Sequence, residues 1–385
     1  MEKKNSNFGI CIFLVIVLSA LFIFFGNKLC RLEKSALGSS EVYYSATVTQ
    51  IQEGSESESV YSSDSGELIS EDIHFTAELK SGDSKGKSID AVQHIDYMYA
   101  YVFEPVEVGD RIIVTSIYDF STNDYNWQFG GYDRTQSLIV LVLVFFALII
   151  AVGRAKGVLT IISLIITALA VFLVYVPSIL KGMNIYISTI IVGAFTTLAT
   201  LLLLNGADKK TLSAIVGNLG GLVVSGIIAA IMNAVLEITG LSDEDFVSLK
   251  LLDTGVEIDL VAVIWGGMVI GALGAIMDVA MSIASSMQEL SDNMEKKSFA
   301  NMFKSGMNIG KDAIGTMTNT LILAYIGSSL VTVLLLVAYN KDLLFLFNLE
   351  TIAIEIVQAI SGSIGIICAV PLTAAFSAFV FTRKN

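Results

Sequence analysis

The sequence predicts an α-helical polytopic membrane protein with about eight transmembrane helices and one small extracytoplasmic all-β domain inserted between helices 1 and 2. Three observations predict this fold class. Only 15% of the residues are charged and 54% are apolar, whereas soluble domains average about 25% charged residues. Apolar runs of about 20 residues, the length that spans a bilayer, recur along the chain. Residues 27–134 differ from the rest, because they hold 19 acidic and 8 basic side chains.

The first apolar run, Ile10–Phe25, follows the basic pair Lys3 and Lys4. A cleaved signal peptide is the alternative interpretation, but no small-residue cleavage site follows the run. We therefore expect residues 1–26 to form a retained signal anchor that is also the first transmembrane helix.

Residues 27–134 are expected to form the extracytoplasmic β-rich domain, a small barrel or sandwich. Four segments are rich in β-branched and aromatic residues and are separated by turn residues. Val108–Arg111 is predicted to be a tight turn, and the Ser- and Glu-rich stretch Gly54–Gly66 a flexible loop. The four predicted strands are Val42–Ile51, His74–Leu79, Ser88–Ile95 and Arg111–Ile117.

This acidic domain contains both histidines of the chain, His74 and His94. A metal site could use them, but no cysteine or carboxylate cluster stands at ligand spacing beside them. We interpret both as surface or strand-face residues and expect no metal and no cofactor. Cys30 has no second cysteine in residues 27–134, which excludes a disulfide framework there. The strong acidic balance argues against nucleic acid as a partner.

Residues 135–385 are expected to form a seven-helix transmembrane domain embedded in the lipid bilayer. Several of the apolar runs exceed 20 residues, so their ends should protrude or tilt. The expected helices are Gln136–Val152, Val158–Leu180, Ile185–Asn205, Leu212–Thr239, Leu260–Leu290, Ala313–Tyr339 and Ile352–Phe381.

The distribution of basic residues supports eight spans with both termini in the cytoplasm, because cytoplasmic loops carry an excess of Lys and Arg. In this topology, three basic residues lie in short outside loops and twelve lie inside. Three others, just outside the first helix, do not fit the rule: Lys28, Arg31 and Lys34. The twelve inside residues are Lys3, Lys4, Arg154, Lys156, Lys209, Lys210, Lys296, Lys297, Lys304, Lys311, Arg383 and Lys384.

The predicted span Leu260–Leu290 carries a stripe of glycine and polar residues at steps of 4, 3, 4, 4, 3 and 4, which places them on one helix face. Its glycines let a neighbouring helix approach closely. A carboxylate at a helix centre costs about 3 kcal/mol in a bilayer, so this face must meet protein or water. The stripe consists of Gly267, Gly271, Gly274, Asp278, Ser282, Ser285 and Glu289.

The next predicted span places Asp312, Thr316 and Asn319 on one face, and antiparallel packing brings Asn319 to a depth similar to that of Asp278. We interpret the two faces as a polar path for protons or small ions, with Asp278 as the group that binds the proton. A hydrogen-bonded packing contact is the alternative. For Asp312 and Glu289, helix capping or snorkelling is an equal alternative.

Gly217 and Gly221 form a small-xxx-small pair in the span Leu212–Thr239, which predicts helix packing. No zinc-protease motif, complete P-loop or nucleophile elbow occurs in the sequence. We therefore do not expect an enzyme.

Two segments, Gly271–Leu290 and Gly306–Leu330, resemble the YibE/F family of bacterial membrane proteins. The apolar order from about residue 136 to 381 fits that family, and the β-domain resembles the insert of its longer members. The resemblance implies a polytopic protein of the bacterial cell membrane, often encoded beside a shorter homologue that is a candidate partner. The residues that carry it are Gly274–Ala280, Ser282, Ser285, Glu289, Gly310–Asp312 and Gly315–Tyr325.

The glycines before Asp278 and the small polar residues after it are also similar to the proton-relay helices of SecD/SecF and RND exporters. This sequence departs from them in its short soluble insert and in lacking an intramembrane Arg or Lys beside Asp278. We expect a membrane permease or transport component that is proton-coupled through Asp278. The alternative is a non-transporting assembly or sensory subunit that works with the shorter homologue.

Overall fold

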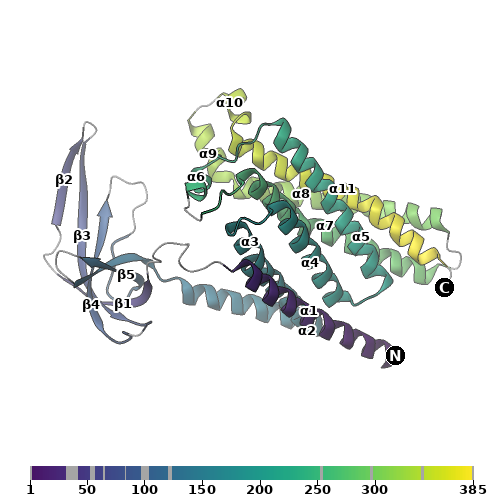
Figure 1. The fold of residues 1–385 in the computed structure, drawn as a ribbon, viewed down its shortest axis with the longest axis horizontal. Helices are drawn as coiled ribbons and strands as arrows, with labels where there is room; N and C mark the ends of the chain where they lie inside the picture. Colours follow the sequence, from purple (N-terminus) through teal and green to yellow (C-terminus); the bar gives the residue numbers. More distant parts are fainter. Residues whose placement is uncertain are drawn as a thin grey trace. The chain divides into compact units, whose positions relative to one another are not determined.

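The computed structural model describes residues 2–31, 42–52, 57–63, 66–82, 84–96, 104–119, 124–251, 255–294, 298–339 and 342–383. They form two compact units. One unit comprises Met1–Ala36 and Ile149–Asn385, and the other comprises Leu37–Leu148. In Figure 1 the long helices of the first unit lie in a bundle, and the strands of the second gather into a small sheet structure.

The sheet contains six strands in the order β1-β5-β6-β4-β3-β2, and β1 also pairs with β3. This extra pairing closes five of the strands into a barrel, while β2 continues outward as a hairpin with the first half of β3. All pairs are antiparallel except β4 with β6. The order is that of an OB-fold barrel. The strands are β1 (Tyr43–Ile51), β2 (Ser57–Ser63), β3 (Gly66–Leu79), β4 (Ser88–Asp96), β5 (Arg111–Asp119) and β6 (Asp124–Tyr132).

Alternating burial along the strands explains why this sequence forms a barrel. On β3, Ile73, Phe75, Ala77 and Leu79 are buried, and the residues between them point outward. The amide of Gln93 is buried in this core and hydrogen-bonds to the backbone: its Nε2 donates to Glu104 O at 2.9 Å, and its Oε1 accepts from Val106 N at 2.9 Å.

The four predicted strands are confirmed, as is the turn at Val108–Arg111, where Gly109 has a φ of 99°. The flexible loop predicted for Gly54–Gly66 is wrong at residues 57–63, which form β2; residues 53–56 and 64–65 lie outside the described part. Among the described strands β2 pairs only with β3, and an edge strand needs no apolar face. β6 was not predicted, because Asp, Asn and Gly, which occur in it, are poor strand formers.

Six helical stretches of the described residues are long and apolar enough to cross a membrane, which confirms a polytopic helical fold. They are Phe8–Cys30, Thr135–Leu180, Ile185–Asn205, Lys209–Val235, Leu260–Asn293 and Glu350–Thr382. The helices are α1 (Glu2–Cys30), α2 (Thr135–Ala170), α3 (Val176–Leu180), α4 (Ile185–Asn205), α5 (Lys209–Val235), α6 (Glu244–Leu251), α7 (Leu260–Asn293), α8 (Phe299–Ser328), α9 (Leu330–Ala338), α10 (Leu343–Phe347) and α11 (Glu350–Thr382), with a π-helical turn at Val171–Tyr175.

Most predicted helices differ from the structure in their limits, and the largest differences lie in two regions. The stretch expected as one span, Ala313–Tyr339, is divided into α8 and α9 at Ser329, because the small residues Gly327 and Ser328 precede the break. α8 also begins earlier than predicted, at Phe299. The 46-residue stretch Thr135–Leu180 is interrupted at Arg154, whose φ of 50° and ψ of −128° are not helical.

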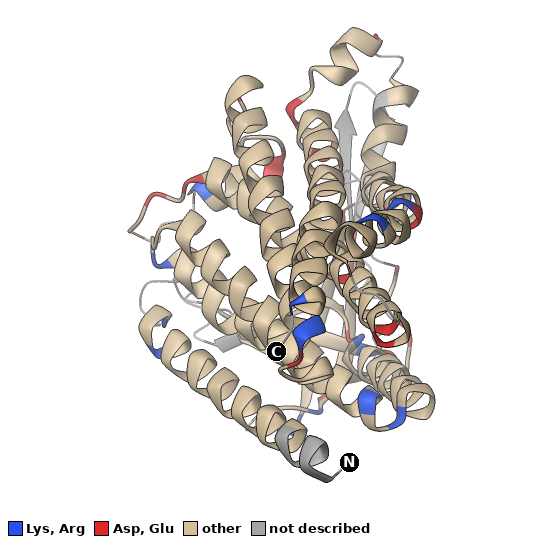
Figure 2. Cartoon of the chain, turned by 90° about the vertical axis from the view of Figure 1, so that its right-hand side faces the viewer, with Lys and Arg blue, Asp and Glu red and all other residues tan. Residues whose placement is uncertain are grey.

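The helical core centres on α7, which packs against α5, α8 and α11. α5 approaches α11 closely where two glycines meet, since a Cβ on Gly221 would lie 2.7 Å from the carbonyl oxygen of Gly365. Figure 2 shows that acidic and basic residues of the bundle lie mostly toward the helix ends and loops. This distribution fits helices whose long middle stretches meet hydrocarbon.

Candidate functional site

One side of α7 is buried in the core and the opposite side is open. Ala272, Ile276 and Ile283 on the inner side are fully buried. The predicted stripe of glycine and polar residues lies on the open side, where all of its members are exposed except Ser285, which is half-buried. These exposed residues are Gly267, Gly271, Gly274, Asp278, Ser282 and Glu289.

Asp278 lies near the middle of α7. It is the only charged residue between Leu260 and Gln288. It lies eighteen positions after Leu260, the first residue of the 34-residue helix, about 27 Å along the axis at the usual helical rise. No described residue forms a hydrogen bond or ion pair with its carboxylate. A Cβ on the neighbouring Gly274 would meet no atom of the described residues within 4 Å, so the space beside Asp278 is open.

α8 packs antiparallel against α7. A Cβ on Gly271 would lie 2.7 Å from the Tyr325 hydroxyl, and a Cβ on Gly306 would lie 2.5 Å from the Met287 sulfur. Between these two contacts, Asp278 lies at about the level of Thr316. This antiparallel arrangement puts Asp278 near the level of the polar part of α8; that the two helices share a path for protons stays a prediction.

The outer side of α8 is polar and exposed over two turns. Thr316 Oγ1 donates to Ala313 O at 3.1 Å, and Thr320 Oγ1 donates to Thr316 O at 2.9 Å. Each hydroxyl therefore donates its hydrogen to a carbonyl of the same helix, and its oxygen can still accept a hydrogen bond from outside the helix. We use the name α7–α8 polar face for a set of exposed glycine and polar residues on the two helices: Gly267, Gly271, Gly274, Asp278, Ser282, Glu289, Asp312, Gly315, Thr316, Asn319 and Thr320.

A polar cluster beside Gly271 was not predicted from the sequence. The side chains of Tyr325 on α8 and Gln358 on α11 hydrogen-bond to each other, and both lie against the position of Gly271. One carboxylate oxygen of Glu355 is buried and has no hydrogen-bond partner among the described residues. The spacing Glu355-x-x-Gln358 in an otherwise apolar helix was the available signal, because it places both side chains on one face.

Gly217 and Gly221 lie in the contact between α5 and α11, where Gly217 packs against Thr373. The glycines of α7 differ from them. Gly267 and Gly274 have open space beside them, so none of the described helices uses the close approach that they permit. Within the residues that the structure describes, no group of three or more His, Cys, Asp or Glu side chains could hold a metal ion.

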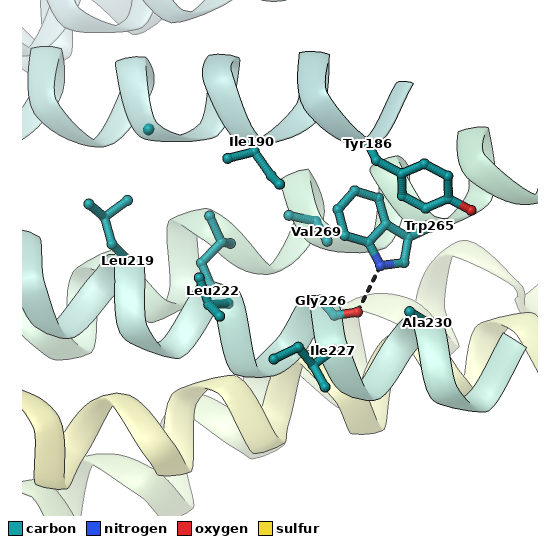
Figure 3. Close-up of a pocket in the computed structure, with 11 residues that line it drawn as sticks. Tyr186, Ile190, Leu219, Leu222, Gly226, Ile227, Ala230, Trp265 and Val269 are labelled. Carbon is teal, nitrogen blue, oxygen red and sulfur yellow. Dashed lines mark hydrogen bonds between the residues drawn. The ribbon is translucent and has the colours of Figure 1, made fainter. Parts of the chain in front are cut away.

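Away from the polar face, a hollow with a volume of about 250 Å³ lies between α4, α5 and α7 (Figure 3). Apart from Tyr186 and Trp265, its lining side chains are aliphatic or glycine. The Trp265 indole donates to Gly226 O at 2.7 Å, and its ring lies 4.8 Å from that of Tyr186. The indole donor is therefore already used, so the hollow offers hydrocarbon surface rather than sites for a polar solute.

A comparison with protein-family models matches residues 141–383 with the model described as YibE/F-like protein. The matched region contains all of the α7–α8 polar face. No curated protein and no solved structure matches the chain.

Proposed function

Because the chain belongs to the YibE/F-like family of membrane proteins, we propose that it is a transport component of the bacterial cell membrane, proton-coupled through Asp278. One observation supports this most: Asp278 lies at mid-helix on an open polar face, among small residues. A carboxylate facing lipid there would be costly. In a water-lined path the same group can bind and release a proton.

The proposal includes a topology of eight spans. α2 and α3 together cross twice, with the turn at Arg154 between the two crossings, and α8 with α9 crosses once. α1, α4, α5, α7 and α11 supply the remaining five crossings. Both termini are then cytoplasmic, and the barrel is extracytoplasmic.

A second membrane subunit covers the α7–α8 polar face in this proposal. The polar residues of that face cannot be left against lipid, and Gly267 and Gly274 leave room for a helix to approach. The shorter homologue that the family resemblance implies is the expected subunit. It would complete a path of which α7 and α8 form one wall.

The test is proton flux in liposomes, followed with a trapped pH dye under an imposed gradient. The protein is reconstituted alone and with the shorter homologue. We expect flux with the parent chain and a loss of at least tenfold with Asp278→Asn, which cannot exchange a proton. Asp292→Asn is the matched control, because Asp292 is an exposed carboxylate at the end of the same helix. Equal flux with Asp278→Asn would overturn the proposal.

The second candidate function is a non-transporting assembly or sensory subunit. The open glycines on α7 favour it, because a small-residue face also serves permanent helix packing. A stable stoichiometric complex with the shorter homologue, without flux in either the parent or the Asp278→Asn protein, would favour this function over transport.

A further inference from the structure

Glu355 on α11 is a second carboxylate within the helical bundle. It lies five positions after Glu350, the first residue of the helix, and no other charged residue occurs between Glu350 and Arg383. Its side chain is half-buried, and one of its oxygens, Oε2, is buried without a hydrogen-bond partner among the described residues. An ionised oxygen in this position has lost its hydration without replacement, so the carboxylate gains when a cation or a proton binds to it.

Among the described residues, Glu355 forms no ion pair with Lys, Arg or His. The helices that pack against α11 are α5, α7, α8 and α10, and α7 and α10 contain neither Lys nor Arg. The last lysine of α8, Lys311, precedes Tyr325 by fourteen positions, about 21 Å along the axis. The lysines of α5 begin that helix, at the end that packs near Thr373, about 27 Å from Glu355 along α11. The titratable side chain that interacts with Glu355 from a neighbouring helix is Tyr325, which is not a cation.

Tyr325 on α8 and Gln358 on α11 lie between Glu355 and the α7–α8 polar face. Tyr325 interacts electrostatically with Glu355 and hydrogen-bonds to Gln358. Both side chains end beside Gly271, because a Cβ there would lie 2.7 Å from the Tyr325 hydroxyl and 3.3 Å from Gln358 Nε2. Since Gly271 is a member of the polar face, polar side chains lead from this face to Glu355.

Glu355 lies on the extracytoplasmic side of this contact in the proposed topology. α7 and α11 run parallel, because Gly365 lies against Ile276, and Gln358, seven positions earlier on α11, lies against Gly271. Both helices begin at the extracytoplasmic end in that topology. Glu355 precedes Gln358 by three positions, about 4.5 Å at the usual helical rise. The carboxylate is therefore closer to the outer surface than the contact at Gly271.

We propose that Glu355 is a second proton-binding residue, which exchanges protons between the extracytoplasmic side and Asp278; this inference rests on the proposed function. The Glu355 carboxylate accepts one proton from outside and becomes a carboxylic acid. When it releases that proton toward the polar face, it returns to a carboxylate, and Asp278 accepts the proton. Asp278 lies seven positions beyond Gly271, about 10 Å along α7. The open space beside Gly274 lies between these two positions.

The first test measures proton binding at Glu355 without transport. The full-length protein in lipid nanodiscs is treated with N,N′-dicyclohexylcarbodiimide, which reacts with protonated carboxyl groups in apolar surroundings. Mass spectrometry then identifies the modified residues over a pH series. We expect modification of Glu355 that decreases as the pH rises. Glu350 is the internal control on the same helix and should stay unmodified, because it accepts hydrogen bonds from Thr239 and Gly240. An unmodified Glu355, or a modification independent of pH, contradicts the proposal.

The second test repeats the flux measurement in liposomes. Glu355→Gln keeps the size of the side chain but cannot exchange a proton, so it should lower the flux at least tenfold. Glu244→Gln is the matched control, because Glu244 is an exposed carboxylate in the first turn of α6; its flux should equal that of the parent.

The two tests separate this inference from the proposed function. Flux that is lost with Asp278→Asn but parental with Glu355→Gln overturns the role of Glu355 and leaves the proposed function standing. Flux that Asp278→Asn does not change overturns the proposed function, and the pH series then decides whether Glu355 binds a proton. If circular dichroism shows that Glu355→Gln does not fold, the modification of the parent chain still tests the inference, because it needs no variant.

Discussion

At the scale of single residues, two glycines differ in what lies beside them: Gly221 is in a close helix contact and Gly274 is next to open space. A Cβ on Gly221 of α5 would lie 2.7 Å from Gly365 O and 2.8 Å from Ile276, whereas a Cβ on Gly274 of α7 would meet no described atom within 4 Å. We expect Gly221→Ala to destabilise the helical unit by about 1–3 kcal/mol, because the core is overpacked. Gly274→Ala should not destabilise it, since alanine is the better helix former.

Thermal unfolding in detergent, followed by circular dichroism, measures both effects. The two substitutions add the same methyl group to a helix, so helix propensity cancels in the comparison. A Gly221→Ala protein as stable as the parent would contradict the close crossing of α5 and α11.

Asp133 gives a residue-scale prediction about pH. Hydrogen bonds from the Ser45 hydroxyl, at 2.5 Å, and from the side chain and backbone of Thr135 hold the pKa of its carboxyl below the ordinary value. A carboxyl with a lower pKa in the folded state stabilises the fold above pH 4 or so and loses that contribution as the pH falls through the folded pKa. We expect Asp133→Asn to cost about 1 kcal/mol at pH 7 and little at pH 2.

Urea unfolding followed by Trp127 fluorescence, in the Trp265→Phe background, measures this difference. Ser45→Ala serves as the companion variant, because it removes the first of the donors and should reproduce part of the loss at pH 7. Equal losses for Asp133→Asn at pH 7 and pH 2 would show that the carboxylate charge does not contribute.

A period along a helix predicts which residues share one face, but not what that face meets. The α7 stripe was found from its spacing, and the structure places it on the open side of the helix. The cluster of Tyr325, Gln358 and Glu355 was missed, because its members come from two helices that are distant in sequence and meet only through packing.

At the scale of elements, the interruption of the Thr135–Leu180 stretch depends on Arg154, with its φ of 50°. This left-handed conformation costs roughly 1–3 kcal/mol for a residue that has a Cβ and little for glycine. We expect Arg154→Gly to raise stability by about 1 kcal/mol. Arg154→Ala is the control, because it removes the charge and retains the Cβ; it should leave stability near that of the parent.

Differential scanning calorimetry of the three proteins in the same detergent tests this expectation. A gain shared by Arg154→Gly and Arg154→Ala would assign the effect to the charge and not to the backbone.

Element type was easier to predict than element limits. Long apolar runs identified the helices, but apolarity does not mark where a helix begins, so the amphipathic start of α8 at Phe299 was missed. β2 was missed because its Ser-rich sequence gives no alternating pattern; its pairing with β3 decides its structure. Such pairing depends on contacts that a local pattern does not contain.

At the scale of the whole molecule, the chain joins an acidic barrel unit to an apolar helical unit. The composition predicted a β-rich domain at residues 27–134, because charge and apolar runs occupy different segments, whereas the compact barrel unit comprises Leu37–Leu148 and so includes the start of α2. The number of crossings does not follow from the six apolar stretches alone. The 46-residue stretch is long enough for two crossings. α8 is not among the six, since Lys304, Lys311 and Asp312, together with the Gly, Thr and Asn residues that follow them, lower its hydropathy.

Cysteine labelling of intact cells can count these crossings. Single cysteines are introduced after Cys11, Cys30 and Cys368 are replaced by serine. With eight spans, Lys85→Cys in the barrel and Glu244→Cys in α6 should react with an impermeant maleimide before lysis. Lys209→Cys and Asp292→Cys should react only after lysis. Lys209→Cys is decisive: three crossings separate it from the barrel if Thr135–Leu180 crosses twice, but only two if it crosses once. Labelling of Lys209→Cys in intact cells would therefore show that Thr135–Leu180 crosses the membrane once, as a single tilted span.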